Sequence, residues 1–121
     1  ILFEKGQLIL APWGTVTDPA TWGTEVPGRI QTLSIKTKKL EFLGGNEKPL
    51  ANGDGLVSDG KGNYFVGDWM NGNIYLVNKS SEAALVATVA QGMGDFFYIE
   101  KEKLFLVPVG KLNKLFAYKV K

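Results

Sequence analysis

The sequence predicts an all-β fold, and within that class a β-propeller of about three four-stranded blades. Short apolar runs, rich in aromatic and β-branched residues, alternate with turns that contain glycine, asparagine or aspartate. The order strand, turn, strand, loop, strand occurs three times, and the second strands at Tyr64 and Leu104 lie 40 residues apart. A repeat of about 40–45 residues with four strands is typical of a propeller blade, although an open antiparallel sheet or a β-sandwich would give similar spacing.

The composition agrees with one soluble domain. The chain has 121 residues, of which 45% are hydrophobic and 21% charged, and this is enough for a core of its own. The net charge of +2 is too small to indicate binding to nucleic acid or to an anionic membrane surface, and no apolar run of about 18 residues predicts a membrane span. We therefore expect a soluble protein, whose compartment the sequence leaves open while slightly favouring an extracytoplasmic one.

The chain contains neither cysteine nor histidine. The absence of cysteine excludes disulfides and thiolate chemistry, and the absence of histidine removes the commonest general base and transition-metal ligand. Any metal ion would be held by oxygen atoms, which favours calcium or magnesium.

The first blade is predicted within residues 1–45. A turn at residues 4–6 joins its first two strands. The stretch 15–28 contains two prolines and four threonines, so we predict a long loop here rather than a helix. A basic turn at residues 36–39 leads to the last strand of this blade. Strands are predicted at 1–3, 7–11, 29–35 and 40–43.

The second and third blades are predicted at residues 46–90 and 91–121. In the second blade, Asp59-Gly60 and the glycine and asparagine that follow supply the positive φ angles of a hairpin turn. Residues 80–84 suit either one helical turn or, as we favour, a loop. Strands are predicted at 56–58, 64–66, 73–77 and 85–89, and then at 96–99, 104–107 and 115–120.

Three blades cannot close a ring on their own, because propellers have at least four and an open blade face leaves apolar surface in water. The last predicted blade also lacks its outer strand. We therefore expect this chain to be the C-terminal half of a six-bladed ring, completed either by another fragment or by a second copy of the chain.

The segment 53–69, GDGLVSDGKGNYFVGDW, resembles the blade signature of the senescence-marker-protein and gluconolactonase-like family and of related NHL-repeat propellers. In that signature an Asp-Gly pair precedes an apolar strand, and a second Asp and a Gly-Asn pair precede an aromatic strand. Residues 94–107 and 114–120 resemble the last blade of the same family, so the resemblance covers nearly the whole chain. It implies a six-bladed propeller and, for the enzymes of the family, hydrolysis of lactones or esters.

The resemblance also implies a metal site at the top of the central channel. In the family's enzymes a divalent cation, often calcium, polarises a lactone carbonyl and activates water. The family's aspartate ligand corresponds to Asp54, and Asn52 would add an oxygen beside it. The other ligands of the family would precede Ile1, so this chain alone cannot supply the six to eight oxygens of a usual calcium site. The alternative role of Asp54 is an Asx turn before Gly55.

Four further residues are predicted to bind a ligand: Asp95, which we align with Asp54, and Trp13, Trp22 and Asp68 in loops on the same face. Tryptophan beside carboxylates at a channel mouth suits a sugar-derived or other small polar ring. Packing between blades is the alternative for Trp13, and it is the role that we favour for Trp69. Trp22 lies in the long loop, where packing demands are weaker, so it is the better candidate for recognition.

Two functions follow from the sequence. The first is part of a gluconolactonase-like, metal-dependent lactone or ester hydrolase, with Asp54 as a metal ligand. The second is a non-catalytic propeller that binds a small ligand or a protein through the loops of its top face.

Overall fold

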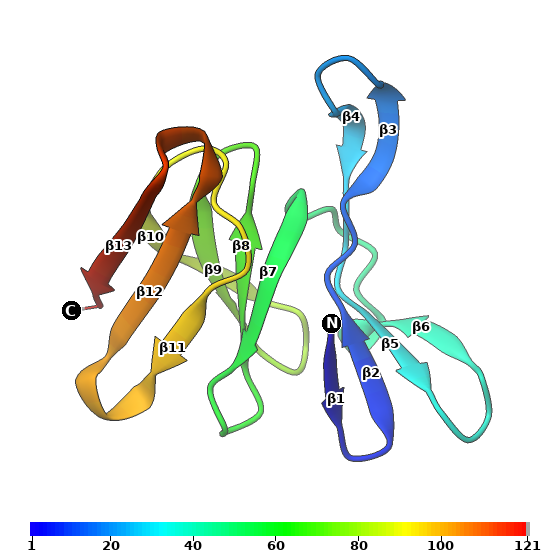
Figure 1. The fold of residues 1–121 in the computed structure, drawn as a ribbon. Coiled ribbons are helices and arrows are strands. Elements are labelled where there is room, and N and C mark those ends of the chain that lie inside the picture. The colour runs from blue at the N-terminus through cyan, green and yellow to red at the C-terminus, as the bar shows by residue number, and fades with distance from the viewer. Residues whose placement is uncertain (121) are drawn as a thin grey trace.

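The structure, a computed structural model that describes residues 1–120, is all-β. It contains three antiparallel sheets and a separate hairpin, and none of the sheets closes into a barrel (Figure 1). The helical segments in residues 1–120 are three 3-10 turns, Leu43–Gly45, Glu100–Glu102 and Gly110–Leu112. In that part of the chain no helix is long and apolar enough to cross a membrane.

Each sheet is a meander in which hydrogen-bonded neighbours follow the chain order. The first sheet contains β1 (Leu2–Glu4), β2 (Gln7–Leu10), β5 (Gln31–Ser34) and β6 (Leu40–Phe42). The middle sheet contains β7 (Gly53–Ser58), β8 (Tyr64–Asp68), β9 (Asn73–Val77) and β10 (Ala83–Thr88). The third sheet contains β11 (Phe97–Ile99), β12 (Leu104–Val109) and β13 (Lys114–Lys119).

The hairpin turn between β7 and β8 forms as its sequence predicts. Gly60 has a φ of 73°. The Asp59 carboxylate accepts the N–H groups of Lys61 at 2.7 Å and of Asn63 at 2.9 Å. A glycine in the left-handed region and an aspartate that bonds the backbone ahead of it are what a tight turn requires.

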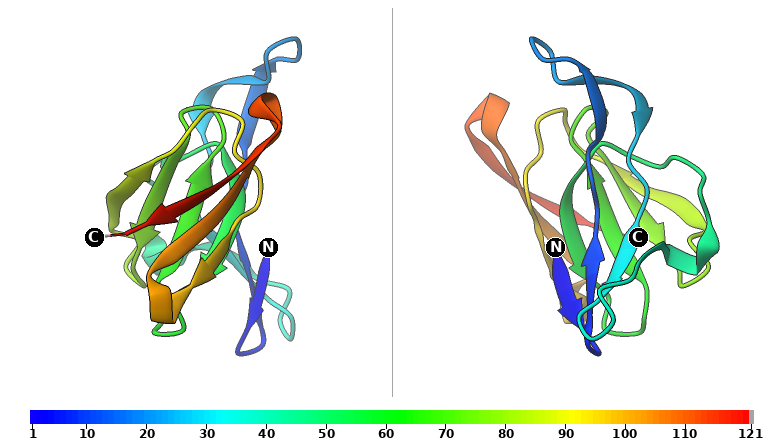
Figure 2. Two further views of the ribbon diagram at one scale, coloured as in Figure 1. Left: turned by 60° about the vertical axis from the view of Figure 1, so that its left-hand side comes forward. Right: turned by 90° about the vertical axis from the view of Figure 1, so that its right-hand side faces the viewer.

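The prediction of a loop at residues 15–28 is wrong. This stretch forms a two-stranded hairpin of β3 (Gly14–Asp18) and β4 (Gly23–Pro27), which we call the arm. Figures 1 and 2 show the arm projecting beyond the sheets as a continuation of β2 and β5. The threonines and valines of the stretch favour strands, while Pro19 lies in the turn and Pro27 ends a strand, so neither proline interrupts a ladder.

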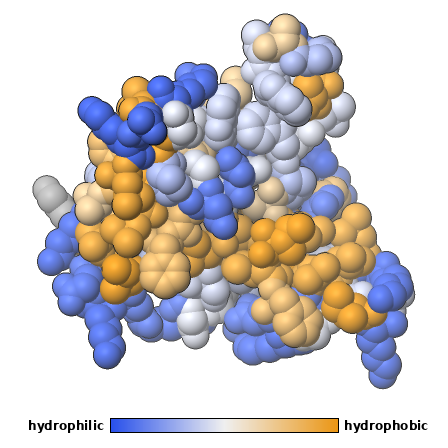
Figure 3. Space-filling model, viewed as in Figure 1, coloured by the Kyte–Doolittle hydropathy of each residue, from blue (hydrophilic) through white to orange (hydrophobic). Residues whose placement is uncertain are grey.

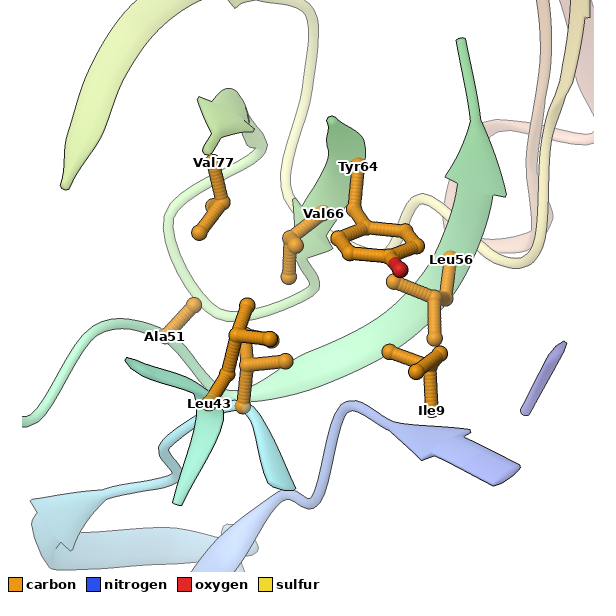
Figure 4. Packing of buried hydrophobic residues seen from close by; sticks show 8 residues of the cluster. Ile9, Leu43, Ala51, Leu56, Tyr64, Val66 and Val77 are labelled. Carbon is orange, nitrogen blue, oxygen red and sulfur yellow. The ribbon is translucent and has the colours of Figure 1, made fainter. Parts of the chain in front are cut away.

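Two apolar clusters hold the sheets together face to face. The cluster between the first and middle sheets is drawn in Figure 4 and contains Ile9, Ile30, Leu43, Ala51, Leu56, Tyr64, Val66 and Val77. The Tyr64 hydroxyl donates to a Glu4 carboxylate oxygen at 2.7 Å, which adds a polar tie between these two sheets. The cluster between the middle and third sheets contains Phe65, Ile74, Ala87, Met93, Phe96, Phe105, Val107 and Val109.

The sequence matches Tyr64 of the middle sheet with Leu104 of the third sheet, and the directions of the side chains show that this match is one residue off. In β8, Tyr64 faces the first sheet. In β12 it is Phe105, and not Leu104, that faces the middle sheet. The hairpin of the third sheet closes through the 3-10 turn at Glu100–Glu102, with Ile99 and Leu104 as its last pair. The second strands are therefore 41 residues apart when they are matched by the face they present.

Candidate functional site

The arm and two loops lie at the same end of the molecule, which we call the loop end (Figure 1). The loops are residues 69–72, between β8 and β9, and residues 110–113, between β12 and β13. Connecting loops on a rigid scaffold of strands commonly carry binding residues. Trp13, Trp22 and Asp68, which the sequence predicts for ligand binding, all lie at this end.

A cleft at the loop end, of ≈350 Å³, is lined by Trp13, Val16, Trp22 and Trp69; we call it the tryptophan cleft. The rings of Trp13 and Trp69 pack with their centroids 5.5 Å apart and a 52° tilt. This tilt and separation are typical of a favourable aromatic pair. The structure thus brings together Trp13 and Trp22, which the sequence predicts for ligand binding, and adds Trp69, for which it favours packing.

Trp22 is held at the tip of the arm by local hydrogen bonds. The Asp18 carboxylate accepts the Ala20 N–H at 3.0 Å and the Thr21 hydroxyl at 2.6 Å, and these bonds lower the pKa of Asp18. Trp22 itself has a φ of 59°, and its carbonyl accepts the Trp13 indole N–H at 3.0 Å. Trp22 is 61% exposed, so the backbone at the tip of the arm is held by hydrogen bonds while the apolar ring stays largely open to solvent.

Lys111 supplies the only charge that the structure places against an aromatic ring of the cleft, within residues 1–120. Its ammonium lies 4.5 Å from the Trp69 ring centroid, within the range of a cation–π contact, and it donates to Gln91 Oε1 at 3.1 Å. The sequence did not single out Lys111 or Val16. Both come from segments far in sequence from Trp69, and only the folding of the arm and the third sheet brings them to this end.

Asp54 and Asp95 lie close enough to affect each other. Partial burial, and then the charge of Asp95, raise the pKa of the Asp54 carboxyl. Asp95 Oδ1 accepts the N–H of Phe96 at 3.1 Å and the N–H of Leu56 at 3.3 Å, beside the bulge in β7. When the first strands of the middle and third sheets are matched by the faces of their side chains, Gly94 and not Asp95 is equivalent to Asp54. Asp95 therefore approaches Asp54 from a position one residue further along the chain.

Asn52 and Asp68 are buried, with 5% and 1% of their surface exposed. The Asn52 amide donates to the Trp13 carbonyl at 2.9 Å and to the Thr24 hydroxyl at 2.8 Å, so it fastens the arm to the sheets. The Asp68 carboxylate accepts the Met70 N–H at 3.1 Å, the Asn71 N–H at 3.3 Å and the Asn71 amide at 2.7 Å. The Asn52 side chain thus bonds the backbone of Trp13, and the Asp68 side chain bonds the loop that follows Trp69, so both support residues that line the tryptophan cleft.

The residues present do not make a cation site by themselves. Asp54 is exposed, one oxygen of Asp95 already accepts two backbone N–H groups, and the Asn52 amide nitrogen is committed to the arm. Within residues 1–120 no group of three or more acidic, histidine or cysteine side chains is placed to hold a metal ion. Calcium needs six to eight oxygens, so any cation at Asp54 would require ligands from outside this chain.

Comparison with models of protein families, with curated proteins and with solved structures found no match to this chain.

Proposed function

We propose that this chain is part of a β-propeller that binds a small, flat, largely apolar ligand in the tryptophan cleft without catalysing a reaction. The observation that carries the proposal is the cleft itself, in which three tryptophans and a valine converge from the arm and from the segments that follow β2 and β8. A concave site with an aromatic lining and few polar groups is the usual form of a small-molecule site.

Three features support the propeller architecture. The sheets are meanders of three or four strands, they follow one another along the chain, and each packs face to face on the next. At each of the two junctions a glycine N–H donates to a carbonyl beyond the second strand of the preceding sheet, Gly53 to Pro12 and Gly92 to Trp69, although the two glycines differ by one position in register. The resemblance of residues 53–69 to the gluconolactonase-like blade signature points to the same architecture.

The chemistry of the cleft favours a flat aromatic ring over the polar ring that the sequence suggests. The Trp13 indole N–H already donates to the Trp22 carbonyl, so it is not free for a sugar hydroxyl. Lys111 stands against Trp69 and adds positive charge at the edge. An aromatic ring that carries a carboxylate matches this arrangement, since the ring can stack on indole and the carboxylate can meet the ammonium.

Calorimetric titration with 2-naphthoate, with glucose as the polar comparison, tests this proposal. We expect 2-naphthoate to bind and Trp22→Ala to weaken it about tenfold, because a stacked aromatic contact contributes on the order of 1 kcal/mol beyond its buried area. Leu85→Ala is the matched control, since Leu85 is 57% exposed, close to the 61% of Trp22, and does not line the cleft. Equal affinities of these two variants, or tighter binding of glucose, would refute the proposal.

A metal-dependent lactone hydrolase is the second candidate, and one observation favours it. Asp54 and Asp95 come together at the loop end, and partial burial, followed by the charge of Asp95, disfavours the ionisation of Asp54, which a bound cation would stabilise. The hydrolase needs further metal ligands from outside this chain. Thermal melting with and without calcium tests it: a rise in Tm that Asp54→Asn abolishes supports the hydrolase, and coincident melting curves count against it.

A further inference from the structure

The middle sheet is covered on both faces, whereas the first and third sheets are covered on one face each. Along β8, Tyr64 and Val66 face the first sheet, and Phe65 faces the third. The first sheet contributes Ile9 to the shared cluster and the third contributes Phe105. Because side chains alternate between the faces of a strand, each terminal sheet presents a second face that no other part of residues 1–120 covers.

The free face of the first sheet is apolar across all four strands. Phe3 pairs with Leu8, Leu8 with Leu33, and Leu33 with Leu40, so these four side chains form one row on the face opposite Ile9. Phe3 is 70% exposed and Leu40 is 52% exposed. We call this row the first free face.

The free face of the third sheet is apolar as well. Phe97 pairs with Leu106, and Leu106 with Ala117, on the face opposite Phe105, while Leu115 pairs with Pro108 in the neighbouring row. Phe97 is 63% exposed and Leu115 is 68% exposed. We call this the second free face; Figure 3 shows apolar surface over both sides of the molecule in this view.

We propose that the first free face of one copy of this chain packs on the second free face of another copy, so that two copies close a ring of six sheets. The two faces correspond to the two sides of each internal interface. The first free face is equivalent to the face of the middle sheet that packs on the first sheet. Leu8 pairs with Leu33 on the first free face, and Tyr64 pairs with Val77 on the equivalent face of the middle sheet. On the other side of the middle sheet, Phe65 pairs with Val57, and both pack against the third sheet.

The second free face has the same correspondence. Phe97 pairs with Leu106 in the third sheet as Val57 pairs with Phe65 in the middle sheet. The first free face of one copy would therefore pack on the second free face of another copy in the way that the equivalent faces already pack on each other inside the chain. Since the contact is head to tail, it closes only if the rotation between sheets returns to the start, and this closure rests on the proposed propeller architecture.

The exposed area agrees with a missing interface. The chain exposes 7288 Å², whereas a compact monomer of 13.2 kDa exposes roughly 6400 Å² by the usual scaling. The excess, about 900 Å², includes the projecting arm and is close to the roughly 800 Å² that one stable interface takes from each partner, and the closed pair has two such interfaces. Apolar faces of this kind rarely remain in water in monomeric proteins.

Sedimentation equilibrium of the whole chain over a range of concentrations tests the pairing. We expect a mass of twice the 13.2 kDa chain for the unsubstituted chain and for Leu85→Glu, since Leu85 is exposed at 57% but lies on neither free face. Leu40→Glu on the first free face and Leu115→Glu on the second should each shift the mass towards one chain, while circular dichroism checks that both variants stay folded.

Mixing the two variants gives a second readout. In a head-to-tail pair, a mixed dimer of Leu40→Glu and Leu115→Glu has one interface with two unsubstituted faces, so we expect the mixture to associate more tightly than either variant alone. A monomeric unsubstituted chain, a loss of association in only one variant, or open assemblies larger than two chains would overturn the closed pair. None of these outcomes bears on the tryptophan cleft, whose titration with 2-naphthoate tests the proposed function separately.

Discussion

Replacement of Asp68 by alanine should lower the free energy of unfolding by about 3 kcal/mol. The Asp68 carboxylate is 1% exposed and accepts three hydrogen bonds from Met70 and Asn71. Net contributions of hydrogen bonds to a charged group are about 1.5–3 kcal/mol, and a buried donor left without a partner costs about 1–3 kcal/mol. Asn71 is exposed, so water can replace some of the lost hydrogen bonds. We therefore add the lower ends of the two ranges, which gives a cost of about 3 kcal/mol.

Asp59→Ala is the matched control for this prediction. Asp59 accepts the same set of bonds, from the N–H groups of Lys61 and Asn63 and from the Asn63 amide at 2.7 Å, but it is half-buried and its turn faces solvent. We expect a cost of about 1 kcal/mol there, because water replaces the lost acceptor.

Urea denaturation followed by far-UV circular dichroism measures both variants. With a slope of about 1.5 kcal/mol per molar urea, Asp68→Ala should lower the unfolding midpoint by about 2 M and Asp59→Ala by under 1 M. Equal midpoints of the two variants would refute the reasoning that burial decides the cost. An unchanged midpoint for Asp68→Ala, together with lost affinity for 2-naphthoate, would instead make Asp68 a ligand contact, as the sequence predicts.

Three further predictions concern the arm, the paired carboxylates and the tie between sheets. Gly28→Ala should unfold much of the chain in urea titrations, because its Cβ would lie 1.7 Å from the Pro12 carbonyl oxygen, whereas Gly110→Ala, with open space around it, should not. The pKa of Asp54 is raised from its ordinary value of 3.8, so Asp54→Asn should raise Tm at pH 7, and the gain should disappear below about pH 3.8, where the carboxyl is protonated in both states. Tyr64→Phe should cost about 1 kcal/mol in urea and should remove from an alkaline absorbance titration the phenol whose pKa burial and a β1 glutamate raise to about 12.

The strands of the three sheets were predictable because local signals agreed with one another. Aromatic and β-branched runs lie between glycine and aspartate turns, and 73–77 is a strand as predicted. The arm was missed because Pro19 and Pro27 outweighed the strand propensity of the residues around them. The face of β12 was missed because it depends on the turn at Glu100–Glu102, whose type the strand pattern does not determine.

The candidate site was predictable only where a residue's place in a strand or loop carried the information. Trp13 and Trp22 line one cleft at the loop end, and Asp54, near the start of β7, meets Asp95, which lies just before β11. The contact of Lys111 with Trp69 joins residues 42 apart and has no local signal. The bonds of Asp68 to Asn71 did have one, since Asp59 and Asn63 show the same arrangement of aspartate before asparagine in a turn.

The arm enters and leaves the first sheet at nearly one point. There the Gly28 N–H donates to the Trp13 carbonyl at 3.1 Å and to the Ala51 carbonyl at 2.9 Å. The arm is thus inserted between β2 and β5, which pair directly with each other and would still pair without it. A scaffold built in this way can acquire a new specificity by exchanging one hairpin while the residues that stabilise its sheets stay as they are.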